Sequence, residues 1–186
     1  MSENGMVGEL RRFAVETRVA FANFVLRIPI QRLRNFSART LMRWVVGRDV
    51  VIGRWTFVSD LGGIEIGDNT NIGYHSHLDG RGKIKIGSFV DMAPFVTIHS
   101  GDHDPNDPDH GTRYRPTTIG DRVWLCTGAT VMSGAVLKDG VVLGAKAVAF
   151  GVLEENGIYA GNPAKLIKHR DPGGQKNLKP YRRYWI

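Results

Sequence analysis

The chain has 186 residues, of which 42 % are hydrophobic and 23 % charged, as expected for one folded domain and not for a disordered segment. The formal net charge of +7 lies in the flanks, because residues 1–50 and 150–186 carry the basic excess. No nucleic-acid-binding motif accompanies that charge, so we expect no nucleic-acid partner. A single cysteine, Cys126, excludes an internal disulfide. With no signal-peptide pattern and no long apolar span, the composition predicts a cytoplasmic protein.

Two amphipathic helices are predicted within residues 1–45. The first carries an apolar stripe on one face and is expected to end or kink at Pro29, and the second follows over residues 30–45. The stripe consists of Leu10, Phe13, Thr17, Phe21, Phe24 and Ile28. The favoured interpretation is a cap over the open end of the repeat that follows. The alternative, peripheral contact of a basic amphipathic helix with an anionic membrane, stays open.

Over residues 46–153 an aliphatic side chain recurs every six residues, and a small or β-branched residue stands four places after most of them. One hexad suits a short strand and a tight turn, three hexads close a triangular coil, and stacked coils bury the aliphatic side chains. The pattern predicts an all-β solenoid, a parallel β-helix of about five triangular coils. An antiparallel sandwich does not require a six-residue register. The aliphatic positions include Ile52, Ile72, Met92, Leu125 and Leu143.

The register stops between Ile98 and Ile119, where the sequence reads HSGDHDPNDPDHGTRYRPTT. Its prolines and aspartates predict a loop, residues 104–118, extruded from the third coil. The aspartate spacing resembles the start of a calcium loop, but Asp107 and Arg113 stand where Gly and Glu are needed, so calcium is not expected. Beyond the solenoid, residues 154–186 predict a Gly-Asn-Pro turn and a basic, aromatic tail.

Five of the six histidines lie between residues 75 and 110. A zinc hydratase on the same repeat, as in the gamma-class carbonic anhydrases, would need a His pair late in the solenoid. The corresponding coil, IGDRVWLCTGATVMSG, contains none. We therefore expect no metal site.

Three blocks make the chain resemble the hexapeptide-repeat acyltransferases, especially the sugar O-acetyltransferases of the galactoside, maltose, nodulation and colanic-acid type. They are IGSFVDMAPFVTIHSGDHD, PTTIGDRVWLCTGATVMSGAVLKDGVVLGAKAV and AGNPAKLIK. The resemblance implies a left-handed β-helix, a homotrimer, and transfer of an acetyl group from acetyl-CoA to a hydroxyl of a polysaccharide or glycolipid precursor. An N-acyltransferase for an amino sugar or antibiotic, and a non-catalytic β-helix assembly platform, are the alternatives.

The same resemblance assigns roles to individual residues. His103 matches the catalytic histidine, a general base toward the acceptor hydroxyl. The expected acetyl-CoA contacts are Trp124 beside the catalytic cleft, Thr127 and Ala145 along the pantetheine arm, and Lys165 and Lys168 at the nucleotide phosphates.

The candidate acceptor-binding residues are His75, His77, Asp79 and Arg81. Two positions depart from the galactoside type, because Gly73 stands where those enzymes have Asn and Arg81 where they have Asp. The acceptor of the galactoside type is therefore not expected to carry over to this chain.

Overall fold

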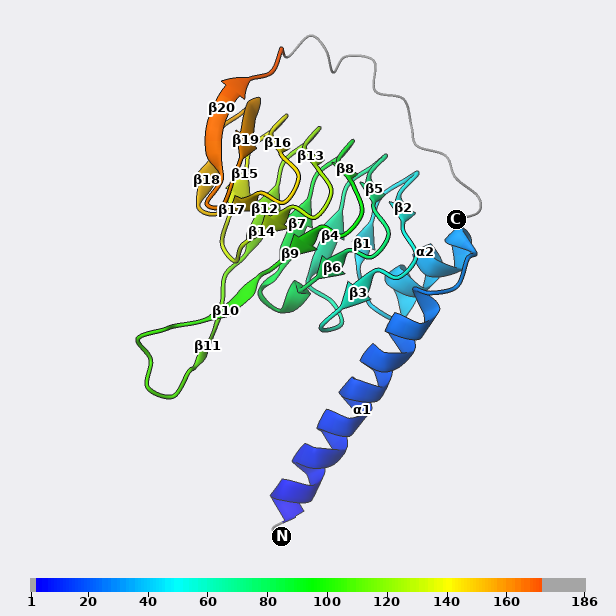
Figure 1. The fold of residues 1–186 in the computed structure, drawn as a ribbon. Coiled ribbons are helices and arrows are strands. Elements are labelled where there is room, and N and C mark those ends of the chain that lie inside the picture. Colours follow the sequence, from blue (N-terminus) through cyan, green and yellow to red (C-terminus); the bar gives the residue numbers. More distant parts are fainter. Residues whose placement is uncertain (1–2, 172–186) are drawn as a thin grey trace.

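A computed structural model describes residues 3–171, which form a parallel β-solenoid with two helices beside its first coil (Figure 1). Three parallel sheets make the faces of a triangular prism. Residues 172–186, most of the predicted tail, lie outside the described residues.

Each face stacks strands from successive coils. Face 1 contains β1 (Val45–Val46), β4 (Ile64–Ile66), β7 (Ile84–Ile86), β12 (Thr117–Ile119), β15 (Val136–Leu137) and β18 (Val152–Leu153). Face 2 contains β2 (Val51–Ile52), β5 (Asn71–Ile72), β8 (Asp91–Met92), β13 (Trp124–Leu125), β16 (Val142–Leu143) and β19 (Gly157–Ala160). Face 3 contains β3 (Phe57–Val58), β6 (His77–Leu78), β9 (Thr97–Ile98), β14 (Thr130–Val131) and β17 (Val148–Ala149). We call the corners between faces edge 1/2, edge 2/3 and edge 3/1.

The predicted hexad core is confirmed. On face 2 the interior side chains of five successive coils are fully buried: Ile52, Ile72, Met92, Leu125 and Leu143. Backbones of neighbouring coils approach so closely that a Cβ added to Gly53 would lie 2.4 Å from the backbone nitrogen of Tyr74. No side chain fits there, which explains why a glycine directly follows the aliphatic residue at this position.

The solenoid is slightly longer than the predicted five coils, because faces 1 and 2 gain strands of a sixth. The addition on face 2 is β19, which places Tyr159 in register with Leu143 and nearly buries it. The repeat hid this position, because the spacing shortens from six residues to four between Ala149 and Leu153, and Tyr159, six residues after Leu153, is aromatic. Strand β20 (Lys165–His169) then turns back and pairs antiparallel with β19.

The helices α1 (Glu3–Val25) and α2 (Gln31–Thr40) pack on the first coil and hydrogen-bond its backbone through polar side chains. The Asn23 side chain bonds both the carbonyl oxygen and the N–H of Val58, at 3.0 and 2.9 Å. The buried guanidinium of Arg34 donates to the carbonyl oxygen of Ile52 at 2.7 Å. Burial, and secondarily Arg54, lowers the pKa of Arg34 to about 10. The first coil lacks a preceding strand, so these side chains satisfy backbone groups left free at its end.

The apolar stripe predicted on the first helix does not take part in this contact. Leu10, Phe13, Phe21 and Phe24 are 56–69 % exposed, whereas Ala22 and Leu26 are buried against the first coil. The second helix is also shorter than predicted, ending at Thr40 instead of residue 45. The open end of the first coil presents backbone N–H and carbonyl groups. The side chains of Asn23 in α1 and Arg34 in α2 can hydrogen-bond these groups, and phenylalanine side chains cannot. No helix in the described part of the chain is long and apolar enough to span a membrane.

The interruption of the repeat forms a hairpin at edge 3/1. Strands β10 (Gly101–His103) and β11 (Thr112–Tyr114) pair antiparallel between β9 and β12. The predicted irregular loop is therefore partly ordered as β-structure, and Figure 1 shows it projecting from the solenoid.

Candidate active site

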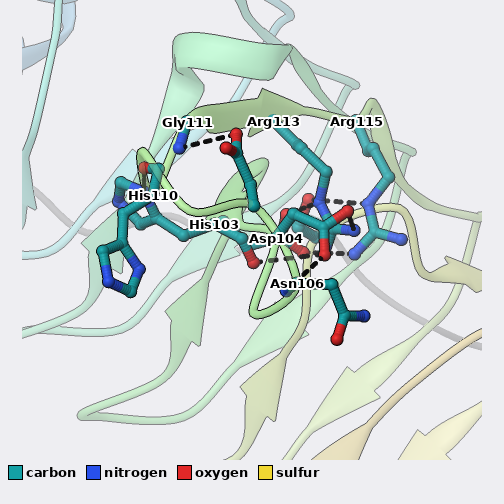
Figure 2. A network of polar contacts seen from close by, with 10 residues as sticks. His103, Asp104, Asn106, His110, Gly111, Arg113 and Arg115 are labelled. Carbon is teal, nitrogen blue, oxygen red and sulfur yellow. Dashed lines mark hydrogen bonds and ion pairs between the residues drawn. The ribbon is translucent and has the colours of Figure 1, made fainter.

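The hairpin is held together by ion pairs along its strands. Arg113 bonds Asp102 and Asp104, each at 3.0 Å, and donates to the carbonyl oxygen of His103 at 3.2 Å. Arg115 adds a second contact to Asp102. Figure 2 shows the two arginines extending side by side toward the aspartates. Burial by itself would raise the pKa of Asp102, but the hydrogen bonds from Arg113 and Arg115 lower it below the usual value.

The tip of the hairpin satisfies its own backbone. The Asp104 carboxylate accepts from the Asn106 N–H at 3.0 Å, and the Asp107 carboxylate accepts from the N–H of Gly111 at 2.9 Å. Such aspartate-centred turns fix a loop without burying it. The aspartates that resembled a calcium loop therefore have a structural role in the turn.

His103 ends β10 opposite Thr112. Its Nδ1 lies 2.6 Å from the carbonyl oxygen of His110 (Figure 2). A carbonyl oxygen only accepts, so Nδ1 must carry the proton in this contact, and the lone pair of the neutral ring lies on Nε2. The ring is exposed. This arrangement leaves Nε2 available to take a proton from a bound hydroxyl group.

Two predicted acceptor residues lie at the base of the hairpin. Asp79, which is buried, receives a bidentate contact from Arg81 at 2.8 and 2.9 Å. Arg81 stands in the short 3₁₀ helix η1 (Gly80–Gly82), and its guanidinium lies 5.7 Å from the ring centre of Tyr114 in β11. The carboxylate of Asp79 is thus engaged in orienting Arg81, whose exposed end is the part free to meet a ligand.

His77 lies on face 3 near this base. Its Nε2 contacts the Ser59 hydroxyl at 2.8 Å, and its ring stands edge-to-face to His99 at 5.9 Å. Burial lowers the pKa of His77, and the neighbouring His99 adds to the effect. A neutral His77 is therefore favoured at neutral pH.

His75 is separated from these residues, because it turns the corner at edge 2/3 with a φ of 57°. There its ring stacks between Trp55 and Phe95, with centroid separations of 5.9 and 5.2 Å. The four predicted acceptor residues thus divide between two edges of the prism: His77, Asp79 and Arg81 near the hairpin, and His75 in an aromatic column.

The predicted acetyl-CoA contacts form one strip along face 2 and edge 2/3. Trp124 points outward from β13 and is 48 % exposed. Thr127 and Ala145 occupy exposed turns after β13 and β16, and Lys165 and Lys168 lie exposed on β20. These strands are neighbours in the order β13, β16, β19, β20.

Within one chain the strip and His103 lie on different edges of the prism. His103 leaves the solenoid at edge 3/1, whereas Thr127 and Ala145 stand at edge 2/3. The described chain therefore does not bring its predicted base and its predicted donor-binding residues onto the same edge.

Cys126 follows Trp124 and Leu125 at the end of β13. Burial raises the pKa of its thiol, and Asp91 raises it further. A protonated thiol is a poor nucleophile, so an acetyl-enzyme intermediate on Cys126 is disfavoured. Within residues 3–171, no cluster of three or more histidine, cysteine, aspartate or glutamate side chains is arranged to hold a metal ion.

Sequence reasoning missed the partners that position His103 and Arg81. These are the His110 carbonyl, Arg113, and the Tyr114 ring. The alternation of aspartates and arginines on the two arms of the hairpin is the only signal that the sequence offers for them.

A six-residue repeat wound into a parallel β-solenoid, with a histidine on an extruded hairpin, defines the hexapeptide-repeat class of protein. No family model matches the chain. It is 33 % identical to a putative lipopolysaccharide biosynthesis O-acetyl transferase, WbbJ, of Escherichia coli K12, over 88 % of this chain and 89 % of the relative. It is 30 % identical to the putative colanic acid biosynthesis acetyltransferase WcaF of the same organism, over 74 % and 72 %.

Among solved structures, a hexapeptide-repeat acetyltransferase of Vibrio cholerae in complex with acetyl-CoA has a similar fold. The TM-score is 0.78 at 19 % identity, over 85 % of this chain and 88 % of that one. The chain belongs to the hexapeptide-repeat acetyltransferases.

Proposed function

We propose that the protein transfers an acetyl group from acetyl-CoA to a sugar hydroxyl, with His103 as the general base. The observation that carries the proposal is the contact between His103 Nδ1 and the His110 carbonyl oxygen. It fixes the neutral tautomer with a free Nε2, as a base of this kind requires. The ion pairs of Arg113 support it further, because they hold both arms of the hairpin around His103.

In the proposed reaction, Nε2 of His103 takes the acceptor hydroxyl proton as the oxygen attacks the thioester carbonyl carbon. The carbon–oxygen bond forms, the tetrahedral intermediate collapses, and the carbon–sulfur bond breaks. The proton held on the imidazolium then passes to the leaving thiolate of coenzyme A. The Nδ1–H donor contact stabilises the imidazolium throughout, because the His110 carbonyl carries the negative end of its dipole.

The residues of the strip fit acetyl-CoA. Lys165 and Lys168 are both exposed on β20, three residues apart, and offer positive charge to phosphates. Thr127 and Ala145 leave room for the narrow pantetheine arm along edge 2/3. The relative from Vibrio cholerae, whose fold is similar, was solved with acetyl-CoA bound.

We infer that the active enzyme is a homotrimer with sites shared between chains. His103 and the strip lie on different edges of one prism, so a neighbouring copy can bring its hairpin to the strip of the next. Mixing experiments test this arrangement. Chains with His103→Ala and chains with Trp124→Ala, each inactive alone, should regain part of the activity when assembled together. No recovery in mixed trimers would contradict a shared site.

The acceptor class rests on the relatives, whose names refer to lipopolysaccharide and colanic acid synthesis. We propose a hydroxyl of a polysaccharide precursor. The test incubates the protein with acetyl-CoA and a panel of sugars that carry free hydroxyl or amino groups, and follows thiol release. An ester in the product supports the proposal. An amide alone would favour the N-acyltransferase alternative, and no acceptor-dependent thiol release with any sugar would favour an assembly platform.

A further inference from the structure

Arg81 touches both arms of the hairpin that carries His103. Its guanidinium lies 5.7 Å from the ring centre of Tyr114 in β11, and a Cβ added to Gly101 in β10 would lie 3.4 Å from its Nη2 atom. Gly101 and Tyr114 face each other as the first pair of the hairpin, and His103 stands two residues further along β10. The guanidinium therefore packs on the hairpin where it leaves the solenoid, and the missing side chain of Gly101 leaves it room.

The same guanidinium is fixed to the solenoid. Nε and Nη2 of Arg81 donate to the two carboxylate oxygens of Asp79, at 2.8 and 2.9 Å, and the Asp79 side chain is only 2 % exposed. Asp79 directly follows β6 and caps η1, since its carboxylate also accepts from the backbone N–H of Arg81 at 3.3 Å. Two parallel hydrogen bonds fix the orientation of a planar guanidinium as well as its position. Arg81 is therefore held in one orientation relative to the solenoid.

Ser100, at the root of the hairpin, bonds the same short helix. Its buried hydroxyl accepts from the N–H of Gly82 at 2.7 Å and donates to the carbonyl oxygen of Asp79. Its carbonyl oxygen accepts from the N–H of Arg115 at 2.8 Å, and the Arg115 side chain reaches the Ser133 hydroxyl at 3.4 Å. These bonds fix the root. Beyond it β10 and β11 form a sheet of their own, and two strands alone are marginally stable. The direction of the hairpin therefore depends on a contact beyond the root.

We propose that Arg81, held by Asp79, is a positioning residue that sets the direction of the hairpin and thereby the place of His103. The inference rests on the proposed role of His103 as general base. It differs from the acceptor contact that the sequence predicted for Arg81. Asp79 already neutralises the guanidinium, and Asp60 adds a second negative charge nearby, so the site is poorly suited to an anionic acceptor. A base displaced by about 1 Å can lose about 10²-fold in rate, so a contact that fixes its place matters for turnover.

Steady-state kinetics separates positioning from acceptor binding. Arg81→Gln should lower kcat about ten- to a hundredfold and leave the KM for acceptor and for acetyl-CoA within about twofold. Arg81→Lys keeps the charge but loses the planar fork, so it should not restore kcat. The control Arg48→Gln removes an arginine that is also doubly bonded to one aspartate, Asp68, at edge 1/2, and it should leave kcat unchanged. A raised acceptor KM at unchanged kcat would overturn the proposal.

Tyr114→Leu tests the same contact from the hairpin. The ring is 54 % exposed, so its loss should not unfold the solenoid. This variant should lower kcat about three- to tenfold, and Arg81→Gln/Tyr114→Leu should be no slower than Arg81→Gln alone, because both substitutions break one contact. Losses that multiply in the double variant would overturn the proposal.

Amide hydrogen exchange reports on the hairpin without any substrate. Arg81→Gln should speed exchange over residues 101–114 at least about fivefold, with exchange in β7 and β12 unchanged, because the hairpin opens locally. Hairpin exchange equal to that of the wild type would overturn the proposal. Faster hairpin exchange in a protein whose wild type transfers no acetyl group to any acceptor would refute the proposed function, and the attachment of the hairpin through Arg81 would still be supported.

Discussion

The third coil and the hairpin inserted in it are stabilised by different interactions. In the coil, Ile86, Met92 and Ile98 are at most 1 % exposed, and the backbone bonds the coils on both sides. In the hairpin, no residue from 102 to 116 is buried, and the strands are joined by ion pairs and aspartate turns. Burial supplies most of the stability of a fold, whereas exposed ion pairs supply little. The proposed base thus lies in a hairpin whose residues can be substituted without unfolding the solenoid.

The largest effect should come from His103→Ala, which tests whether the hairpin carries the chemistry. We expect acetyl transfer to fall about 10²- to 10⁴-fold, the range for loss of a general base. Because the ring is exposed, the melting temperature should stay close to that of the wild type. Steady-state kinetics measures the first quantity and circular dichroism the second. Added imidazole should restore part of the rate, and a variant within threefold of wild type would contradict the assignment.

The converse substitution, Leu125→Ala, should damage the solenoid. Removing this fully buried side chain from face 2 should lower the free energy of unfolding by about 2–5 kcal/mol. Its counterpart in the hairpin, Tyr114→Ala, is 54 % exposed and should cost less than about 1 kcal/mol. Denaturant unfolding at one fixed protein concentration compares them. Equal losses would mean that the hairpin is as much a part of the core as the coil.

Two aspartates sharpen the comparison through pH. Burial would raise the pKa of Asp79, but hydrogen bonds from Arg81 lower it below the usual value. A carboxylate whose folded-state pKa is lowered stabilises the fold above its unfolded pKa of about 4, and the contribution disappears as pH falls below that value.

Asp79→Asn should therefore cost about 1–3 kcal/mol at pH 7 and flatten the loss of stability on acidification. The exposed counterpart, Asp102→Asn, should cost at most about 1 kcal/mol at pH 7. Melting temperatures of the three proteins from pH 7 downward supply the measurement. A steeper acid dependence for the Asp79 variant than for the wild type would contradict the role given to Arg81.

The smallest effect is expected at the far end of face 2. Lys165→Ala/Lys168→Ala should raise the KM for acetyl-CoA about three- to tenfold, because exposed charges are screened by salt. The melting temperature should not change, since both side chains are exposed. Wild type should prefer acetyl-CoA to its dephospho form. If the double variant keeps that preference undiminished, the lysines do not contact the 3′-phosphate.

The hexad repeat made the interior predictable, since an aliphatic residue every six positions leaves few choices for what points inward. His103 could be placed at the interruption, because the six-residue register stops at Ile98 and resumes at Ile119. The contacts of its ring could not, because the His110 carbonyl reaches it only through the aspartate turns of the hairpin tip. The sequence also did not show that His75 and His77 lie in different places, one at edge 2/3 and the other on face 3. Two residues are enough for the chain to pass from a corner onto the next face.

By itself, then, the sequence determined the solenoid, its interior, and the coil from which the hairpin leaves, because all three follow from a local periodic pattern. Tertiary structure decided which side of α1 meets the first coil, where Asn23 takes the place of the expected phenylalanines. It also decided that His103 and the strip with Trp124 lie on different edges of the prism. The physical reason is that contacts between coils, and between helix and coil, depend on where each corner and each free backbone group ends up in space, which no short-range pattern encodes.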